Sequence, residues 1–224
     1  MDAKAATASS AAPAPPAWRD RVGPMCGITA VAMLVAKPDA DAARDALADG
    51  GDDKSTKLVD VYSAPVLEAA VAAGYSREGE MFDAGELAEL ARKVLPSAVQ
   101  VHGLAWAAET GVEARVASVA DALAAGAFVL LAYDAAPNHE PALRSGHAAH
   151  WAVVVGVVHV GDSPTYFVTR HGKSSHLALW SAAQLLASNA QLVESHPAKR
   201  ASGHYAMPAD LGDRLASRAV VVSL

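Results

Sequence analysis

Cysteine, charge and aromatic residues are all scarce in this sequence. Of 224 residues, one is a cysteine, 19% are charged and 5% are aromatic. A single thiol cannot form a disulfide within the chain, so nothing indicates an oxidising compartment. The 18 basic residues are outnumbered by 24 acidic ones, which argues against a surface for nucleic acid or an anionic membrane. No apolar run reaches the roughly 18 to 20 residues that cross a bilayer, so we expect a cytoplasmic protein with no membrane contact.

Apolar residues, by contrast, are abundant. They make up 52% of the sequence, which excludes disorder over most of its length. Residues 1–17 are an exception, because they are mainly alanine, serine and proline and lack the apolar core of a secretory signal. No repeat and no second linker interrupts the remainder. We therefore predict a flexible tail over residues 1–17 and one folded domain over residues 18–224.

The first half of the domain has the pattern of helices. Residues 26–36 are apolar almost all round, which is typical of a buried central helix. Asp83 has the position of an N-cap for a helix that ends before Pro96. Two further helices are predicted over residues 39–51 and 64–74.

Short β-rich runs dominate the second half. They cover residues 97–104, 126–133, 150–160, 165–172 and 218–224. Turn-forming residues at 161–164 predict that the third and fourth runs form an antiparallel hairpin. Ser118 and Ser181 are the predicted N-caps of two intervening helices, over residues 118–126 and 182–193. This order predicts an α+β architecture, with a helical N-terminal half packed on an antiparallel sheet from the C-terminal half.

The one cysteine, Cys26, is predicted to lie in the first turn of the buried helix, after a Gly-Pro turn. Unpaired backbone N–H groups and the helix dipole favour an anion there, so the thiol should lose its proton readily. Gly27 would leave the approach to the sulfur open to a peptide. The alternative is that Cys26 is one more small buried residue, as free cysteines often are. Position alone favours neither interpretation.

A thiolate nucleophile needs an acid–base partner, and histidine is best suited to that role near neutral pH. His139, His147 and His150 fall in one short segment. Because His150 directly precedes an apolar strand that would hold its ring at the mouth of a cleft, we predict it as the base. His171, at the end of the next strand, is the candidate for orienting that ring, with Asp134 as a substitute. A histidine at a strand end can equally satisfy only a local hydrogen bond.

The same segment also has the residue types of a zinc site. His139, Glu140, His147 and His150 could all be ligands. Their spacing, however, is not HExxH, and Pro141 directly follows the acid. We therefore predict no metal ion and no other cofactor, and keep a zinc-binding protein as an alternative.

Four ordered segments resemble the actin maturation protease family. They read GPMCGITAVAML around Cys26, GEMF at 79–82, YDAAPNHEPALRSGHAAHWAVVVGV at 133–157 and RHGKSSHLALWSAAQLLASNAQLVE at 170–194. This family belongs to the papain-like cysteine peptidases, near those that trim double-glycine leader peptides. The resemblance spans most of residues 22–194 and implies a papain-like fold.

The resemblance also implies an activity, the removal of an N-acetylated Met or Cys from the N-terminus of immature actin. Cys26 falls on the family's nucleophile and His150 on its histidine. The chain departs from papain-like enzymes in having no glutamine shortly before the cysteine, and from its relatives in having His171 where they have glutamine. The family's proline-rich region, which is linked to binding profilin, is reduced here to APAPP. The resemblance therefore implies actin as the partner, either alone or bound to profilin.

An actin N-terminus is a run of acidic residues, which basic side chains beside the cleft would attract. Arg144, Arg170 and Lys173 flank the predicted base in sequence, although ordinary solvated charge explains them equally well. Trp151 or Trp106 could line an apolar pocket for the acetylated residue. Two further functions stay open, a cell-wall amidase with a Cys-His-His triad and an inactive relative that only binds an acidic peptide or actin.

Overall fold

The part of the chain described by the computed structural model, residues 25–35, 53–174 and 176–223, contains both helices and strands. The helices are α1 (Cys26–Val35), α3 (Asp53–Ala72), α4 (Ala84–Val94), α5 (Val112–Ala124), α6 (Ala182–Ala190), α7 (Pro197–Ser202) and α8 (Gly212–Leu215). The strands are β1 (Gln100–Ala105), β2 (Phe128–Ala135), β3 (Pro141–Ala142), β4 (Ala149–Val160), β5 (Ser163–Arg170), β6 (Ala178–Ser181) and β7 (Arg218–Ser223). The predicted α+β class is confirmed.

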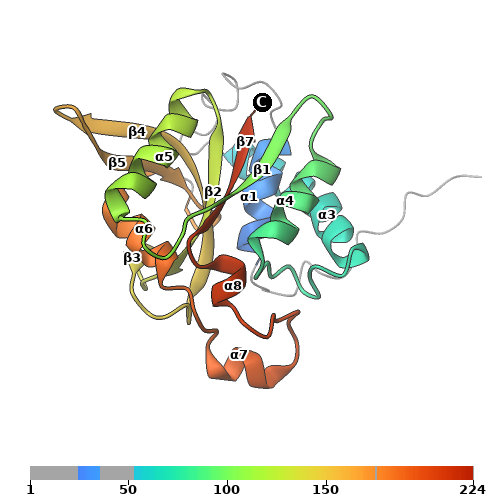
Figure 1. The fold of residues 1–224 in the computed structure, drawn as a ribbon. Coiled ribbons are helices and arrows are strands. Elements are labelled where there is room, and N and C mark those ends of the chain that lie inside the picture. Colours follow the sequence, from blue (N-terminus) through green and yellow to red (C-terminus); the bar gives the residue numbers. More distant parts are fainter. Residues whose placement is uncertain (1–24, 36–52, 175, 224) are drawn as a thin grey trace, which may run out of the picture.

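The strands form one antiparallel sheet in the order β1-β7-β2-β4-β5-β6, with the short β3 paired to β2. The predicted hairpin is present as β4 and β5, joined by a turn in which Gly161 has a φ of 63°. Strand β7 lies between β1 and β2, inside the sheet (Figure 1). The sheet is therefore completed by a segment that follows all of its other strands in the sequence.

The sheet has two apolar faces because side chains alternate along each strand. In β2, Leu130 belongs to one buried cluster and the adjacent Leu131 to the other. Helices α1, α3 and α4 cover the first face, as predicted for the helical half of the chain (Figure 1). Helices α5 and α6 cover the second face, which the sequence analysis did not anticipate. No helix among the described residues has the length and apolarity needed to cross a membrane.

Two predicted helix starts are confirmed by hydrogen bonds. The Asp83 carboxylate accepts from the N–H groups of Gly85 (2.7 Å) and Glu86 (3.2 Å) at the start of α4. The Ser181 hydroxyl accepts from the N–H of Gln184 (3.4 Å) at the start of α6. Polar side chains that satisfy the first free N–H groups of a helix thus set both boundaries, as the sequence pattern indicated.

Two other predicted helix starts are wrong. Helix α5 begins after Gly111, so Ser118 lies within it, where the hydroxyl donates to the carbonyl of Arg115 (2.9 Å) instead of capping. Helix α3 begins at Asp53 and continues through Pro65, which the pattern had placed near a helix start. The helix predicted over residues 39–51 and the tail over residues 1–17 lie outside the described residues.

Asn189 joins the end of α6 to the centre of the sheet. Its side chain is fully buried, and the amide nitrogen donates to the carbonyl oxygens of Ala132 (2.8 Å) and Arg218 (3.1 Å). The first carbonyl belongs to β2 and the second to the start of β7. One side chain therefore fixes the second helical layer against two neighbouring strands.

We expect Asn189→Ala to lower the free energy of unfolding by about 2 kcal/mol, because two buried carbonyl groups lose their donor. Urea denaturation followed by circular dichroism measures the change. Gln184→Ala, on an exposed position of the same helix, is the matched control and should change it by less than about 0.5 kcal/mol. Equal stability of the two variants would contradict this role for Asn189.

Candidate active site

Cys26 and His150 line one cavity at the end of the sheet, where β2 ends and β4 begins. The cavity has a volume of about 380 Å³. Its lining residues are Met25, Cys26, Ala135, Ala136, Pro137, His139, Ala148, Ala149, His150, Lys173, Lys199 and Tyr205. The structure therefore brings together the two residues that the sequence indicated as nucleophile and base.

Burial, more than the helix start, determines the state of the Cys26 thiol. Cys26 is the first residue of α1 and is half-buried. Burial raises the pKa of the thiol above its usual value, while hydrogen bonds from the backbone N–H groups of Trp151 and Gly27 lower it by less. The direction of this shift is opposite to the readily ionised thiol that the helix start had led us to expect.

The start of α1 packs closely against residues 79–82. A Cβ atom on Gly27 would lie 2.7 Å from the Cβ of Met81, so only glycine permits this approach. Trp151 closes the contact, because its indole N–H donates to the carbonyl oxygen of Met81 (2.8 Å). Gly27 thus allows the helix to pack closely against Met81, which is a different role from the open approach to the sulfur that the sequence had led us to expect. The GEMF motif of the sequence is the support on which the cysteine's helix rests.

Glu80, within that motif, connects this support to another wall of the cavity. Its carboxylate is 1% exposed and accepts hydrogen bonds from the Ser76 hydroxyl (3.1 Å) and from the N–H groups of Arg77 (2.8 Å), Glu78 (2.8 Å) and Ala206 (2.6 Å). The last of these holds the segment that carries Tyr205, a lining residue. Sequence reasoning missed both Glu80 and Tyr205, although the GEMF motif pointed to the first.

His150 is held by the pairing of β4 with β2. It lies opposite Tyr133, and the two rings meet edge to face with centroids 5.8 Å apart. The Tyr133 hydroxyl donates to the carbonyl oxygen of His139 (3.0 Å), which fixes the loop that lines the cavity. The Nε2 atom of His150 is buried and has no hydrogen-bond partner among the described residues. This nitrogen is therefore available to a proton from a neighbouring group.

The electrostatic surroundings keep the His150 ring neutral. Burial lowers its pKa to about 4, and smaller effects in the same direction come from His171, Lys173, His139 and Lys199. Burial thus favours the uncharged form of both the thiol and the imidazole in this cavity. Transfer of the thiol proton to the imidazole would produce a sulfur nucleophile and a proton donor in one step.

Two further histidines surround His150, with ring centroids 6.3 Å away for His139 and 6.1 Å away for His171. The His171 ring stacks on Trp180 at 5.5 Å, and its Nδ1 accepts from the N–H of Lys173 (3.3 Å). With Nδ1 occupied in this way, a neutral His171 carries its proton on Nε2 and cannot accept a hydrogen bond there. His171 therefore confines the His150 ring by contact.

Asp134 does not orient His150, contrary to the alternative raised by the sequence. Its carboxylate is fully buried and accepts from the N–H groups of Arg144 (2.9 Å), Gly146 (2.7 Å) and Ala148 (2.7 Å) and from the side-chain amide of Gln191 (3.0 Å). Three of these donors reach Oδ2 and one reaches Oδ1, and none of the four belongs to His150. The carboxylate instead shapes the loop that leads into β4 and its first histidine.

The residues that the zinc alternative would use lie in two different places. The His147 ring lies against Glu194 (3.1 Å) and against the ring of His196 (5.4 Å between centroids), whereas His139 and His150 face each other. In the part of the chain that the structure describes, no three His, Cys, Asp or Glu side chains are grouped so that they could hold a metal ion. The cluster of three histidines read from the sequence is thus divided between two sites.

The residues predicted to bind substrate are dispersed. Lys173 lines the cavity. Arg170 is 4% exposed and Trp151 is 2% exposed, and neither is among the lining residues, because both point into the packed interior. Arg144 is exposed but also lies outside the lining. Trp106 packs against the cluster on the second face of the sheet. Only Lys173 is therefore in position for the expected role.

Lys199, which the sequence analysis did not consider, is a second lysine in the cavity lining. It belongs to α7 and is half-buried. Its positive charge lowers the pKa of both Cys26 and His150, so its ammonium group lies within electrostatic reach of both. No pattern near Lys199 in the sequence marks it, because the fold brings α7 to the cavity from far along the chain.

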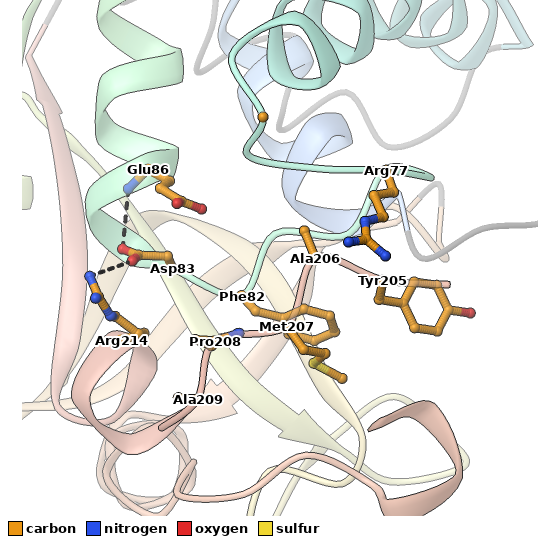
Figure 2. A pocket seen from close by; sticks show the side chains of 11 residues that line it. Arg77, Phe82, Asp83, Glu86, Tyr205, Ala206, Met207, Pro208, Ala209 and Arg214 are labelled. Carbon is orange, nitrogen blue, oxygen red and sulfur yellow. Dashed lines mark hydrogen bonds and ion pairs between the residues drawn. The ribbon is translucent and has the colours of Figure 1, made fainter. Parts of the chain in front are cut away.

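A second pocket, of about 350 Å³, lies beside the first and shares Tyr205 with it. Figure 2 shows Phe82 and Met207 at its centre and the Asp83–Arg214 ion pair (3.0 Å) at one end. Two basic and two acidic side chains are among its lining residues. Its charges are therefore balanced, in contrast to those of the cavity around Cys26.

Comparisons with known proteins relate this chain to one family. Residues 18–158 match the family described as "Actin maturation protease-like, C-terminal domain". The actin maturation protease of Drosophila melanogaster is 35% identical over 176 residues, which cover 78% of this chain and 55% of the fly protein. That of Xenopus tropicalis is 30% identical over 219 residues, covering 83% and 64%, and that of Mus musculus is 28% identical over 229 residues, covering 84% and 56%. The chain thus spans between about half and two thirds of these relatives. No solved structure matches it.

We expect the protein to lose stability between pH 7 and pH 5 because of His150 and His171. Burial lowers the pKa of both rings to about 4 in the folded protein, whereas both titrate near 6.5 in the unfolded chain. Over this window the unfolded state therefore binds protons that the folded state excludes, and stability falls as the pH falls. Each ring should cost about 1 kcal/mol, since partial solvent exposure reduces the full effect. Urea denaturation at the two pH values measures the loss.

Two glutamine variants separate this effect from general acid sensitivity. His171→Gln removes one of the two buried rings and should reduce the loss between pH 7 and pH 5. His176→Gln changes an exposed histidine and should leave the loss as it is in the unmodified protein. If His171→Gln also leaves it unchanged, the His171 ring titrates normally in the folded state.

Proposed function

This chain belongs to the actin maturation protease-like family, and we propose that it is a cysteine protease that removes an N-acetylated Met or Cys from the N-terminus of immature actin. The observation that carries the proposal is the cavity that Cys26 and His150 line together. The family match over residues 18–158 includes both positions. The relatives named actin maturation protease are longer than this chain, so their activity is transferred here as a hypothesis.

In the proposed mechanism, the imidazole of His150 accepts the proton of the Cys26 thiol as the sulfur attacks the carbonyl carbon of the acetylated residue. The carbonyl electron pair moves to oxygen, and the resulting tetrahedral intermediate expels the amine of the next residue, which takes the proton from His150. Water, deprotonated by His150, then cleaves the thioester. The products are the free N-acetylated amino acid and a shortened actin, and the thiol regains its proton.

The developing negative charge on the carbonyl oxygen requires hydrogen-bond donors. The backbone N–H of Cys26, at the start of α1, is the candidate for one of them. A donor of this kind contributes about 3 kcal/mol to the transition state in enzymes where one has been removed. Because the sequence has no glutamine shortly before the cysteine, the proposal assigns this role to the backbone N–H.

The resting state of the site shapes the mechanism further. Because the thiol and the imidazole are both uncharged before substrate binds, the proton moves within the enzyme–substrate complex and not in the free protein. A papain-like arrangement belongs to this proposal, with the nucleophile at a helix start and the base at a strand start. His171 would be a positioning residue that keeps the His150 ring in place through their contact.

A peptide-binding protein without catalysis is the second candidate. The raised pKa of the Cys26 thiol favours it, since a buried protonated thiol is a poor nucleophile unless the base acts on it. In that case the cavity would hold an acidic peptide or the actin N-terminus without cleaving it. Turnover of a substrate peptide distinguishes the two candidates directly.

A cytoplasmic location, and profilin-bound actin as the form of the substrate, belong to the same proposal. Both rest on the family resemblance. The short proline-rich segment that would contact profilin falls within residues 1–17, which lie outside the described residues.

We expect the unmodified protein to shorten an acetyl-Met-Asp actin peptide by its acetylated methionine, and Cys26→Ala to leave the peptide intact. His150→Ala should reduce kcat by at least about 100-fold, because the general base is lost. Mass spectrometry of the peptide over time measures both effects. His176→Ala, an exposed histidine outside the cavity, is the control and should keep full activity.

Circular dichroism shows whether each variant is folded. Unchanged cleavage by Cys26→Ala would exclude the cysteine mechanism. Binding of the peptide without any cleavage by the unmodified protein would favour the second candidate.

A further inference from the structure

The cavity around Cys26 has a one-sided charge. Lys173 and Lys199 are among its lining residues, and none of the lining residues is a carboxylate. Its remaining polar side chains are the thiol, the Tyr205 hydroxyl and the two imidazoles of His139 and His150. A cavity with cationic groups and no acid complements an anion, because the ligand's charge then finds a partner that the protein does not already supply.

The two lysines reach the cavity from different elements. Lys173 follows β5, and its backbone N–H is fixed by the hydrogen bond to His171 (3.3 Å). Lys199 lies within α7, whose first turn is capped by the His196 ring (3.2 Å to the N–H of Ala198). Both charges act on His150, and that of Lys199 acts on Cys26 as well. An anion paired with them would therefore lie next to the reacting atoms.

The neighbouring pocket shows that this charge is a local property. There Arg214 is already paired with Asp83 at 3.0 Å, and Glu86 lies close by (Figure 2). An anion entering that pocket would meet acidic side chains as well as basic ones. Of the two pockets that meet at Tyr205, only the one containing the nucleophile selects for negative charge.

We infer that Lys199, together with Lys173, binds an acidic side chain that adjoins the scissile bond of the substrate. This inference rests on the proposed protease function and names the residues that select its substrate. The ligand class is a peptide whose acidic residue directly follows the residue to be removed. A neutral side chain at that place would leave two ammonium groups facing apolar or amide surface, at a loss of binding.

The test measures binding separately from cleavage. Cys26→Ala protein is titrated with fluorescent peptides that begin acetyl-Met-Asp, acetyl-Met-Asn or acetyl-Met-Lys and end in an amide, so that one side chain alone differs. We expect the Asp peptide to bind about tenfold more tightly than the Asn peptide, with the Lys peptide weakest. Adding Lys199→Glu should abolish or reverse this order. Adding Lys93→Glu instead makes the same charge change at an exposed position of α4, outside the cavity, and should leave the order of affinities unchanged.

Equal affinity for the Asp and Asn peptides would overturn the inference. So would an equal loss of preference in the Lys93 and Lys199 variants, because the overall charge would then explain it. Cleavage by the unmodified protein is followed in parallel. Preference for the Asp peptide without any cleavage would support the binding role of Lys199 and refute the protease. Cleavage of the Asp and Asn peptides at the same rate would support the protease and refute the binding role of Lys199.

Discussion

The structure depends on the close contact between the start of α1 and Met81. Glycine at position 27 lets the helix approach the Met81 side chain, and the Trp151 indole N–H donates to the Met81 carbonyl oxygen from the sheet. Since Trp151 is the residue after His150, one contact positions the strand that carries the base and the helix that carries the thiol. Glu80 extends this frame to the segment of Tyr205. The GEMF motif at residues 79–82 thus helps to position the thiol, the imidazole and one wall of the cavity.

Burial also affects the charge of the thiol and the imidazole that this contact positions. It raises the pKa of the thiol and lowers that of the imidazole, so that neither group is charged before a ligand arrives. The lysines add positive potential at a place that holds no compensating acid. Under the proposed mechanism such a site would be selective in two ways, because it would react only after a proton is transferred and would favour ligands that bring negative charge. The Asp134 carboxylate differs from these two groups, because it is a buried acid that already accepts four hydrogen bonds from the protein.

Local patterns in the sequence predicted the fold class, the caps of α4 and α6, the hairpin and the pairing of Cys26 with His150 in one cavity. These features depend on residues close in sequence or on motifs of fixed order. The patterns failed where distant packing decides: Ser118 could cap a helix but bonds within one, and Arg170 could be solvated but is buried. Lys199 and Tyr205 could not be found at all, because only the return of the chain after α6 brings them to the cavity. The thiol pKa was misjudged since burial is invisible from position alone.

The place of β7 inside the sheet has a consequence for how the molecule is made. Strand β1 joins the remaining strands only through β7, which is synthesised long after both of its neighbours. Until that segment leaves the ribosome, β1 and β2 present open edges, and the two apolar layers cannot be closed around a complete sheet. The nascent chain is then most exposed to aggregation and most in need of chaperones. Closure of the two apolar layers around the sheet is therefore a late event in the synthesis of this chain.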